Sequence, residues 1–332
     1  MTDELLQVRD LSIGFPDSTP VRNLSFSVGR GETVALVGES GSGKSLTALA
    51  LMRLLPRAAR VASGSIRLDG QDLAGLSDRA MRQHRGRDIA MIFQEPMTSL
   101  NPVLTIGRQI SEALRLHRGL SARQARLRAI ELLDLVRIPD PGRRYDDHPH
   151  QLSGGMRQRV MIAIAVACEP KLLIADEPTT ALDVTIQAQV LDLLDRLRRE
   201  LSLGLLLITH DLGIVGQWAD RVVVMYAGRK VEEALPAPLF ADPRHPYTRG
   251  LLAAAPRLSA DQHYRLAPLP EIPGSIASAL GQPGCPFAPR CPISRPACRS
   301  QVPDIIALSP DRQVACPVTL QEGAVHAAAV GL

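Results

Sequence analysis

Residues 38–45, with the sequence GESGSGKS, have the residue types and spacing that most directly indicate chemistry. Gly38 and Gly43 stand at the two glycine positions of the pattern GxxxxGK(S/T). Glycines let a backbone curl so that its N–H groups point at a phosphate. Lys44 can then contact the β- and γ-phosphates, and the Ser45 hydroxyl can bind Mg²⁺. The pattern predicts a nucleotide site; the alternative is a flexible glycine-serine loop with an unrelated lysine.

The segments on either side of this loop can position it. The apolar run at 34–37 predicts a strand buried on both faces. The helix expected after Ser45 presents its positive N-terminal end to the same anion. We expect the whole loop to bind the nucleotide, namely Gly38, Glu39, Ser40, Gly41, Ser42, Gly43, Lys44 and Ser45.

Two later apolar runs also end abruptly on polar residues. The run at 172–175 is followed by Asp176 and Glu177, and the run at 203–209 by His210. Strands that alternate with helices form parallel sheets, which place their carboxyl ends at one edge. Asp176 could hold Mg²⁺ there and Glu177 could polarise a water, unless the pair simply points at solvent.

A serine and two glycines open an amphipathic helix in the segment LSGGMRQRVMIAIAVAC at 152–168. Ser153 and the free N–H groups of a helix start can receive a second anion. An ordinary helix cap has the same sequence. This segment therefore indicates an anion site only in combination with the loop at 38–45. Cys168, at its end, is expected to be a small core residue.

The remaining pattern predicts an α/β fold with two additions. Residues 5–32 alternate as antiparallel strands do, and another strand is expected at 64–70. Helical spacing dominates from about 77 to 165, which predicts a helical subdomain inserted into the core. A hairpin at 221–233 is expected to close the core. Phe15 either packs in the core or stacks on a base.

The composition changes after residue 235. Sixteen of the 26 prolines and four of the five cysteines lie in the last 98 residues. We therefore expect a separate, loop-rich appendage at 236–332.

Overall composition narrows the class of protein. The chain has 332 residues, 45% hydrophobic and 22% charged, which is ordinary for a globular protein. A net charge of +4 is too small to argue for nucleic acid. Apolar runs stop far short of a membrane span, and the N-terminus does not resemble a signal peptide. We expect the chain to stay in the cytosol.

Taken in order, the motifs resemble those of the nucleotide-binding subunit of an ATP-binding-cassette (ABC) transporter. The set comprises the loop at 38–45, Gln94, LSGGMRQR at 152–159, LLIADEP at 172–178, ALD at 181–183 and His210. The resemblance implies a P-loop cassette at 1–235, with a RecA-like parallel core, an antiparallel subdomain and an inserted helical subdomain. A proline- and cysteine-rich extension would follow at 236–332.

The resemblance also implies an activity, the hydrolysis of ATP to ADP and phosphate with Mg²⁺, and a role for each motif. The roles are Glu177 as general base with His210 and Gln94 as further catalytic groups, Mg²⁺ at Ser45, Gln94 and Asp176, and Phe15 on the base. The family more often has tyrosine where Phe15 stands. Four residues would contact the ATP of a partner subunit: Ser153, Gly154, Gly155 and Asp183.

Two segments resemble importers of dipeptides and oligopeptides, a subfamily that also imports nickel and other peptide-like solutes. They are QEPMTSLNPVLTIGRQI at 94–110, and HPYTRGLLAAAP at 245–256 followed by GCPFAPRCP. The implied partners are two membrane permease subunits, a second ATP-binding subunit and an extracytoplasmic solute-binding protein. The implied place is the cytoplasmic face of the bacterial inner membrane.

Other ABC ATPases fit the sequence less well. A chromosome-maintenance ATPase would need a long coiled coil between the loop and the signature, and a translation-associated ATPase would carry two cassettes. An exporter usually has fused membrane helices, and none is encoded here.

Four cysteines of the extension form a further candidate site. Cys285, Cys291, Cys298 and Cys316 are separated by five, six and seventeen residues, which match neither zinc-ribbon nor ferredoxin spacing. Spacing alone leaves a metal or cluster, unliganded thiols and disulfides open. The resemblance implies a [4Fe–4S] cluster, because the quartet looks like the one associated with that cluster in peptide-importer ATPases.

Overall fold

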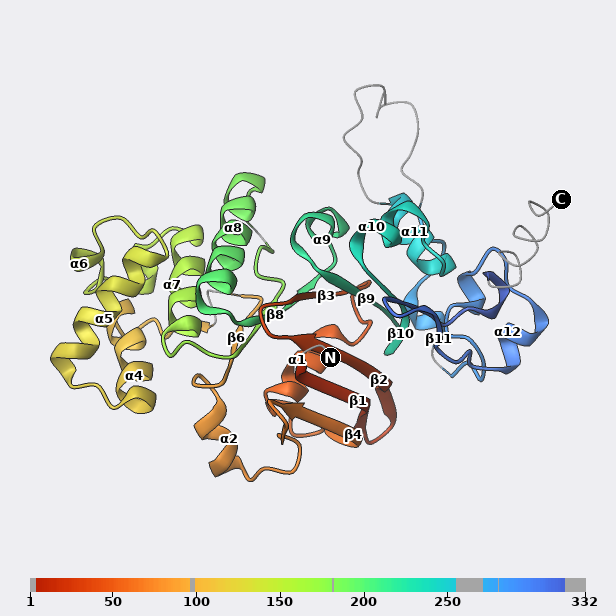
Figure 1. Ribbon diagram of the computed structural model, residues 1–332, viewed down its shortest axis with the longest axis horizontal. Helices are drawn as coiled ribbons and strands as arrows, with labels where there is room; N and C mark the ends of the chain where they lie inside the picture. The colour runs from red at the N-terminus through yellow and green to blue at the C-terminus, as the bar shows by residue number, and fades with distance from the viewer. Residues whose placement is uncertain (1–3, 96–98, 181, 255–270, 280, 320–332) are drawn as a thin grey trace, which may run out of the picture.

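The computed structural model describes residues 4–95, 99–180, 182–254, 271–279 and 281–319. Two β-sheets form its centre, with a helical lobe on one side and the C-terminal extension on the other (Figure 1). None of the helices in these ranges combines the length and apolar character that crossing a membrane requires.

The smaller sheet is antiparallel and contains the first two strands of the chain. Its order is β2-β1-β4-β5, so the antiparallel strands predicted at 5–32 and the strand at 64–70 are confirmed. The bounds are β1 (Glu4–Phe15), β2 (Ser18–Gly29), β4 (Arg60–Leu68) and β5 (Gln71–Asp72).

The larger sheet has eight strands in the order β11-β12-β10-β9-β3-β8-β7-β6. Strands β9, β3, β8, β7 and β6 run parallel, and β10, β12 and β11 are antiparallel to their neighbours. The bounds are β3 (Thr33–Val37), β6 (Ile89–Ile92), β7 (Leu172–Asp176), β8 (Gly204–Thr209), β9 (Arg221–Tyr226), β10 (Arg229–Ala234), β11 (Ile306–Ser309) and β12 (Arg312–Val314). The predicted hairpin is confirmed as β9 and β10.

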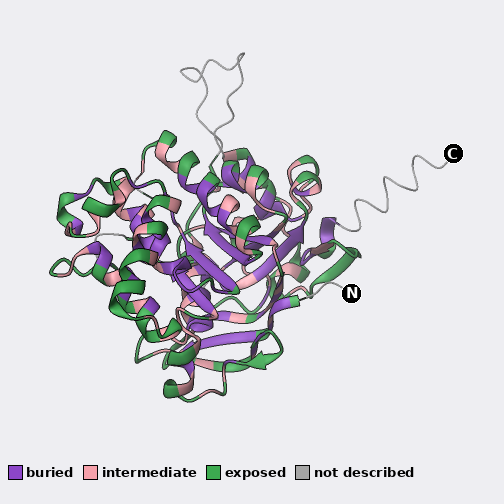
Figure 2. Ribbon diagram, turned by 60° about the vertical axis from the view of Figure 1, so that its left-hand side comes forward, coloured by how far each residue is buried: buried purple, intermediate pink, exposed green. Residues whose placement is uncertain are grey.

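Both faces of the parallel strands are covered, which explains their uninterrupted apolar sequences. In β3, Val34 and Leu36 pack with the smaller sheet and with α1 (Lys44–Leu51). Ala35 and Val37 point to the opposite face and pack with α9 (Leu212–Trp218) and with the extension. Buried residues accordingly concentrate along these strands (Figure 2).

The helical lobe lies between β6 and β7 in the sequence. Its elements are α4 (Ile106–Arg118), α5 (Ala122–Leu135), α6 (Pro141–Arg144), the 3₁₀ turn η1 (Pro149–Gln151) and α7 (Gly154–Val166). The sequence predicts a helical insertion from about 77, but β6 is a strand of the parallel sheet inside that range. An apolar run of four residues between helices carries too little periodicity to be recognised.

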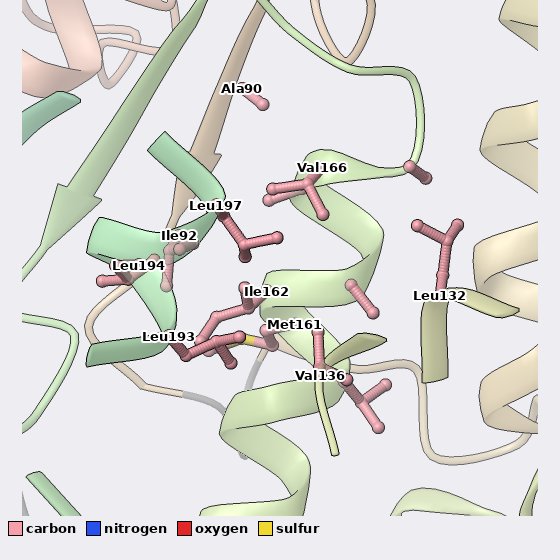
Figure 3. Close-up of a cluster of buried hydrophobic side chains, with 14 of the residues drawn as sticks. Ala90, Ile92, Leu132, Val136, Met161, Ile162, Val166, Leu193, Leu194 and Leu197 are labelled. Carbon is pink, nitrogen blue, oxygen red and sulfur yellow. The ribbon is translucent and has the colours of Figure 1, made fainter. Parts of the chain in front are cut away.

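Helix α7 links the lobe to the core, because both of its sides are packed. Figure 3 shows it between α5 and α8 (Val184–Leu201), with β6 nearby. The labelled side chains are Ala90, Ile92, Leu132, Val136, Met161, Ile162, Val166, Leu193, Leu194 and Leu197.

Side-chain caps begin the helices that bear the motifs. Ser153 caps α7 and Asp183 caps α8, each accepting a hydrogen bond from the backbone N–H three residues on. The remaining helices are α2 (Asp78–His84), α10 (Pro236–Ala241), α11 (Pro246–Ala254), η2 (Ile276–Ala279), η3 (Ala288–Arg290) and α12 (Pro296–Ser300).

The extension is not a separate appendage, which corrects the expectation from composition. Strand β12 pairs with β10, with Glu232 opposite Val314, so the extension continues the main sheet. The buried Glu232 also accepts hydrogen bonds from Arg312 and from the backbone N–H of His245. The strand pairing and the Arg312 contact join residues about 80 positions apart, which composition cannot reveal.

Candidate active site

The loop at 38–45 connects β3 to α1, as the sequence predicts. At Gly38 an added Cβ would lie 2.2 Å from the carbonyl oxygen of Met225 in β9, so the close approach of two strands requires glycine there. Gly43 has φ 99° and directly precedes α1. The strand, the turn and the helix start are therefore fixed together, and the N-terminus of α1 opens toward the loop.

Lys44, the first residue of α1, is buried against the loop. Its Nζ donates hydrogen bonds to the carbonyl oxygens of Gly38 (2.7 Å) and Glu39 (2.9 Å) and to Ser42 Oγ (3.3 Å). Burial lowers the pKa of Lys44, while the nearby carboxylates of Glu177, Asp176 and Glu39 act in the opposite direction. An ammonium group held in this way can donate to phosphate oxygens.

Asp176, the last residue of β7, lies beside the start of α1. The Ser45 hydroxyl donates to Asp176 Oδ1 at 3.1 Å, which joins two of the three predicted magnesium ligands. Burial raises the pKa of Asp176, and the Ser45 hydrogen bond and the Lys44 charge lower it in part. A hydroxyl and one carboxylate fit Mg²⁺, which is commonly bound by one or two carboxylates together with substrate phosphates.

Glu177 is contacted by three polar side chains, two from the segments that follow β6 and β8 and one from its own turn. Gln94 Nε2 donates to its Oε2 at 2.9 Å, the Thr180 hydroxyl donates to the same oxygen at 2.9 Å, and His210 Nδ1 lies 3.2 Å from its Oε1. Glu177 has φ 47°, the left-handed region that a residue with a side chain rarely adopts. Its backbone N–H donates to Ile208 in β8. The carboxylate is therefore held in one direction.

The structure thus brings together the sequence-predicted groups of three strand ends. Gln94 donates to Glu177, whereas the other two predicted magnesium ligands, Ser45 and Asp176, contact each other. Thr180 was not predicted, although it stands three residues after Glu177 in the same motif. Nothing in the sequence distinguishes it from the neighbouring Thr179.

The residues expected to act on a partner's nucleotide lie apart from this group. Ser153, Gly154 and Asp183 are exposed at the starts of α7 and α8, and Ile186 covers Gly155. Phe15 is half-buried at the end of β1, where it pairs with Ser18. The next strand of that hairpin reaches the loop, since Val21 lies against Gly43.

The C-terminal extension contacts the loop through two residues that sequence reasoning missed. Arg290 forms an ion pair with Glu39, and the Tyr247 hydroxyl accepts a hydrogen bond from the Glu39 backbone N–H. Both residues lie in the importer-like segments HPYTRGLLAAAP and GCPFAPRCP, but nothing in those segments indicates a contact with a loop more than 200 positions away.

The cysteine quartet surrounds a cavity of about 450 Å³, lined also by His245 and Phe287. All four cysteines are free, and among the described residues no group of three His, Cys, Asp or Glu side chains has the arrangement of a metal site. Burial raises the pKa of the Cys285 thiol to about 11 and raises that of Cys291. Binding of a metal or cluster by these two thiols would therefore release their protons.

A phosphate loop, oxygen ligands for Mg²⁺ and a fixed carboxylate at the carboxyl edge of a parallel sheet define a P-loop nucleoside triphosphatase. Comparison with known proteins narrows this class. Residues 21–180 match the ABC transporter family, and residues 231–298 match the family described as the C-terminal region of oligopeptide/dipeptide transporters.

Relatives match nearly the whole chain. A protein of Brucella abortus (strain 2308), provisionally named a peptide import ATP-binding protein, is 54% identical over 324 residues, 96% of each chain. The oligopeptide transport ATP-binding protein OppD of Mycobacterium tuberculosis is 52% identical over 317 residues, 94% of this chain and 51% of that protein. The chain therefore belongs to the ABC transporter family, as an ATP-hydrolysing subunit.

Solved structures support the same fold. The dimeric ATP-binding cassette MJ0796, in a post-hydrolysis state with ADP and phosphate, is 27% identical with a TM-score of 0.62, over 70% of this chain and 98% of that one. The cbiO1 protein of Clostridium perfringens, part of the transporter complex cbiONQ, is 29% identical with a TM-score of 0.63, over 72% of this chain and 92% of that one. The predicted fold class is confirmed.

Proposed function

We propose that this chain uses ATP hydrolysis to drive the import of dipeptides or oligopeptides through separate membrane subunits. The proposal rests mainly on the position of the Glu177 carboxylate, which Gln94 and His210 contact. This carboxylate lies near Lys44, and Asp176, which precedes it, is hydrogen-bonded to Ser45. The peptide substrate is supported by the names of the relatives and by the match of 231–298 to the transporters' C-terminal region.

In the proposed chemistry, each side chain around Glu177 has one task. Glu177 accepts a proton from the water that attacks the γ-phosphate, and His210 orients that water and contacts the phosphate. Lys44 donates to the β- and γ-phosphates. Ser45 and Asp176, together with Gln94, would hold Mg²⁺, which would neutralise phosphate charge when bound. Thr180 keeps the Glu177 carboxylate turned toward Gln94.

A second ATP-binding subunit, identical or related, is proposed to complete the site. Ser153, Gly154 and Asp183 are exposed, and the start of α7 offers N–H groups to an anion. They would therefore cover the ATP of the partner, and with Gly155 they form the surface of that contact. The dimeric cassette among the similar structures supports this arrangement.

The wider assembly follows from the same proposal. Two permease subunits would receive the movement of the helical lobe, and an extracytoplasmic solute-binding protein would deliver the peptide. The chain would lie at the cytoplasmic face of the bacterial inner membrane. We assign ATP binding to residues 1–235 and the transporter-specific extension to 236–332.

The first experiment replaces Glu177 by Gln in the chain assembled with its membrane subunits. Mg-ATP should still bind, because Lys44, Ser45 and Asp176 are unchanged. Hydrolysis should fall by roughly a hundredfold or more, the usual effect of removing a general base. The matched control is Glu200→Gln, at an exposed position near the end of α8, which should hydrolyse ATP normally. Undiminished turnover in Glu177→Gln would refute the assignment.

A second experiment distinguishes substrates. Cells that lack the gene should lose uptake of labelled dipeptides or oligopeptides and regain it with the wild-type gene, but not with the Lys44→Ala variant. Loss of Ni²⁺ uptake with normal peptide uptake would instead assign the chain to a nickel importer.

We further propose that the cysteine quartet holds a [4Fe–4S] cluster. Support comes from the donor set, because all four thiols line one cavity. Anaerobically purified protein should contain iron and sulfide, with the broad visible absorption of a cluster. Cys298→Ala should lose both, and Cys168→Ala, outside the cavity, should retain them. A colourless, iron-free wild-type protein would contradict the proposal.

A further inference from the structure

The C-terminal extension makes polar contacts with the phosphate loop at Glu39. Arg290 Nη1 lies 2.7 Å from Glu39 Oε2, and Arg290 Nη2 lies 3.1 Å from Oε1, so the pair is bidentate. The Arg290 side chain is only 5% exposed, and that of Glu39 is 25% exposed. Water therefore screens this ion pair less than an ordinary surface pair.

Arg290 is itself fixed by the extension. Its Nη2 donates to the carbonyl oxygen of Ile272 at 3.0 Å, and its Nε donates to that of Pro273 at 2.8 Å. Its Nη1 also contacts the Tyr226 hydroxyl at 3.3 Å. Because these groups hold the guanidinium, Glu39 meets a preformed cation rather than a mobile side chain.

Tyr247 holds the backbone of the same loop residue. Its hydroxyl accepts a hydrogen bond from the Glu39 N–H at 2.8 Å. The ring is fully buried and packs against Tyr226 at 4.6 Å and Phe287 at 5.5 Å between ring centroids. Two aromatic neighbours thus restrict the position of the hydroxyl.

Glu39 also contacts Lys44, so the position of Glu39 affects the position of the Lys44 ammonium group. The Glu39 carbonyl oxygen accepts hydrogen bonds from Lys44 Nζ at 2.9 Å and from the Ser42 N–H at 3.1 Å. All three polar groups of Glu39 are therefore engaged: its carboxylate by Arg290, its N–H by Tyr247, and its carbonyl by Lys44 and Ser42. A continuous set of contacts runs from the extension to the lysine of the phosphate loop.

The ion pair also affects the electrostatic potential around the bound phosphates. The Glu39 carboxylate lies close enough to act on the Lys44 ammonium. In the absence of Arg290 the same carboxylate would repel the phosphates of ATP, because its negative charge would no longer be compensated. Arg290 therefore both orients the loop and neutralises its acidic residue.

We propose that Arg290 and Tyr247 are positioning residues of the ATP site. The extension at 236–332 therefore completes an ATP site that the cassette at 1–235 alone would leave incomplete. Arg290 acts through Glu39 on the charge and shape of the phosphate loop, and Tyr247 acts through the Glu39 backbone. The inference concerns ATP binding by this chain and is independent of which solute is imported.

The test compares four variants of the full chain assembled with its membrane subunits. Arg290→Ala should raise the KM for Mg-ATP about tenfold, the effect of losing one charge-assisted contact, and change kcat much less. Adding Glu39→Gln to Arg290→Ala should restore KM to within about threefold of wild type, since the uncompensated charge is removed. Tyr247→Phe, which keeps the buried ring, should raise KM about threefold.

Arg299→Ala is the matched control, because Arg299 is an exposed arginine of the same extension in α12. It should leave KM and kcat unchanged, and thermal unfolding of each variant checks that the fold is kept. Unchanged KM in both Arg290→Ala and Tyr247→Phe would overturn the proposal. A raised KM in Arg290→Ala that Glu39→Gln fails to restore would overturn the electrostatic role. If Arg290→Ala does not fold, Tyr247→Phe alone decides, through KM.

Discussion

At the scale of single residues, the site contains charged side chains that are buried and a non-glycine residue with a left-handed backbone. Both placements are unfavourable in isolation. Lys44 is buried in spite of its charge, Asp176 is buried as a carboxyl group, and Glu177 has a left-handed backbone. Each is compensated by a named contact: three oxygens around Lys44 Nζ, the Ser45 hydroxyl on Asp176, and Gln94, Thr180 and His210 on Glu177. Such unfavourable placements are characteristic of functional sites.

Gly38 provides a steric prediction at this scale. Gly38→Ala would put a Cβ 2.2 Å from the Met225 carbonyl oxygen, so the loop must shift away from β9. We expect binding of Mg-ATP to weaken by at least about tenfold, measured by equilibrium titration. Gly142→Ala in α6, where an added Cβ meets nothing within 4 Å, should bind normally. Equal affinity in the two variants would contradict the account of the loop.

His245 provides a pH prediction. Burial lowers its pKa from 6.5 to about 3, with the charge of Arg249 as a smaller cause. The unfolded chain therefore takes up a proton below pH 6.5 that the native chain does not, and stability falls as pH falls from 6.5 toward 3. From pH 7 to pH 5 the loss from this group is about 2 kcal/mol.

Urea denaturation of His245→Gln at both pH values measures this contribution. The variant should lose less stability on acidification than the wild type, by about the same 2 kcal/mol. His150→Gln, an exposed histidine of η1, should behave as the wild type. A wild type and a His245→Gln variant with the same pH dependence would show that His245 titrates normally in the fold.

At the scale of elements, sequence patterns predicted most of what is local. Buried strands such as β7 and β8 have continuous apolar sequences, and α4 and α5 have clear helical spacing, so their positions could be read from the chain. The phosphate loop, Asp176, Glu177 and His210 followed because polar residues end these strands.

The elements that the sequence did not predict depend on distant contacts. Strand β12 is three residues long and becomes a strand by pairing with β10. Strand β6 is four residues long and lies between helices in the sequence, so its apolar pattern is too short to recognise. The segments around Arg290 and Tyr247 contain no pattern that indicates a contact with Glu39. Tertiary contacts decide such features, so a local pattern cannot.

Arg312 tests whether β12 is integral to the sheet. Its guanidinium, 12% exposed, donates to the fully buried Glu232 carboxylate. Among the described residues, Arg312→Ala leaves that carboxylate with the backbone N–H groups of Arg244 and His245 as its donors. We expect a loss of about 2 to 4 kcal/mol in the free energy of unfolding, measured in urea, against no change for Arg299→Ala. A loss under about 0.5 kcal/mol would show that the extension adds little to the core.

At the scale of the whole molecule, the chain is a linked set of parts around one nucleotide site. The helical lobe reaches it through Gln94, the parallel core supplies the strand ends, and the extension meets it at Glu39 (Figure 1). A change in the contacts of ATP would therefore affect both the helical lobe and the C-terminal extension. This connectivity suits a subunit whose ATP hydrolysis moves its partners.

The most direct test measures ATP hydrolysis and peptide uptake together, in proteoliposomes that contain the complete complex with its solute-binding protein. The wild-type chain should take up labelled peptide only with Mg-ATP, and Lys44→Ala should abolish hydrolysis and uptake to the same extent. Peptide uptake that persists without ATP or with Lys44→Ala, or a complete complex that does not hydrolyse Mg-ATP, would contradict the account.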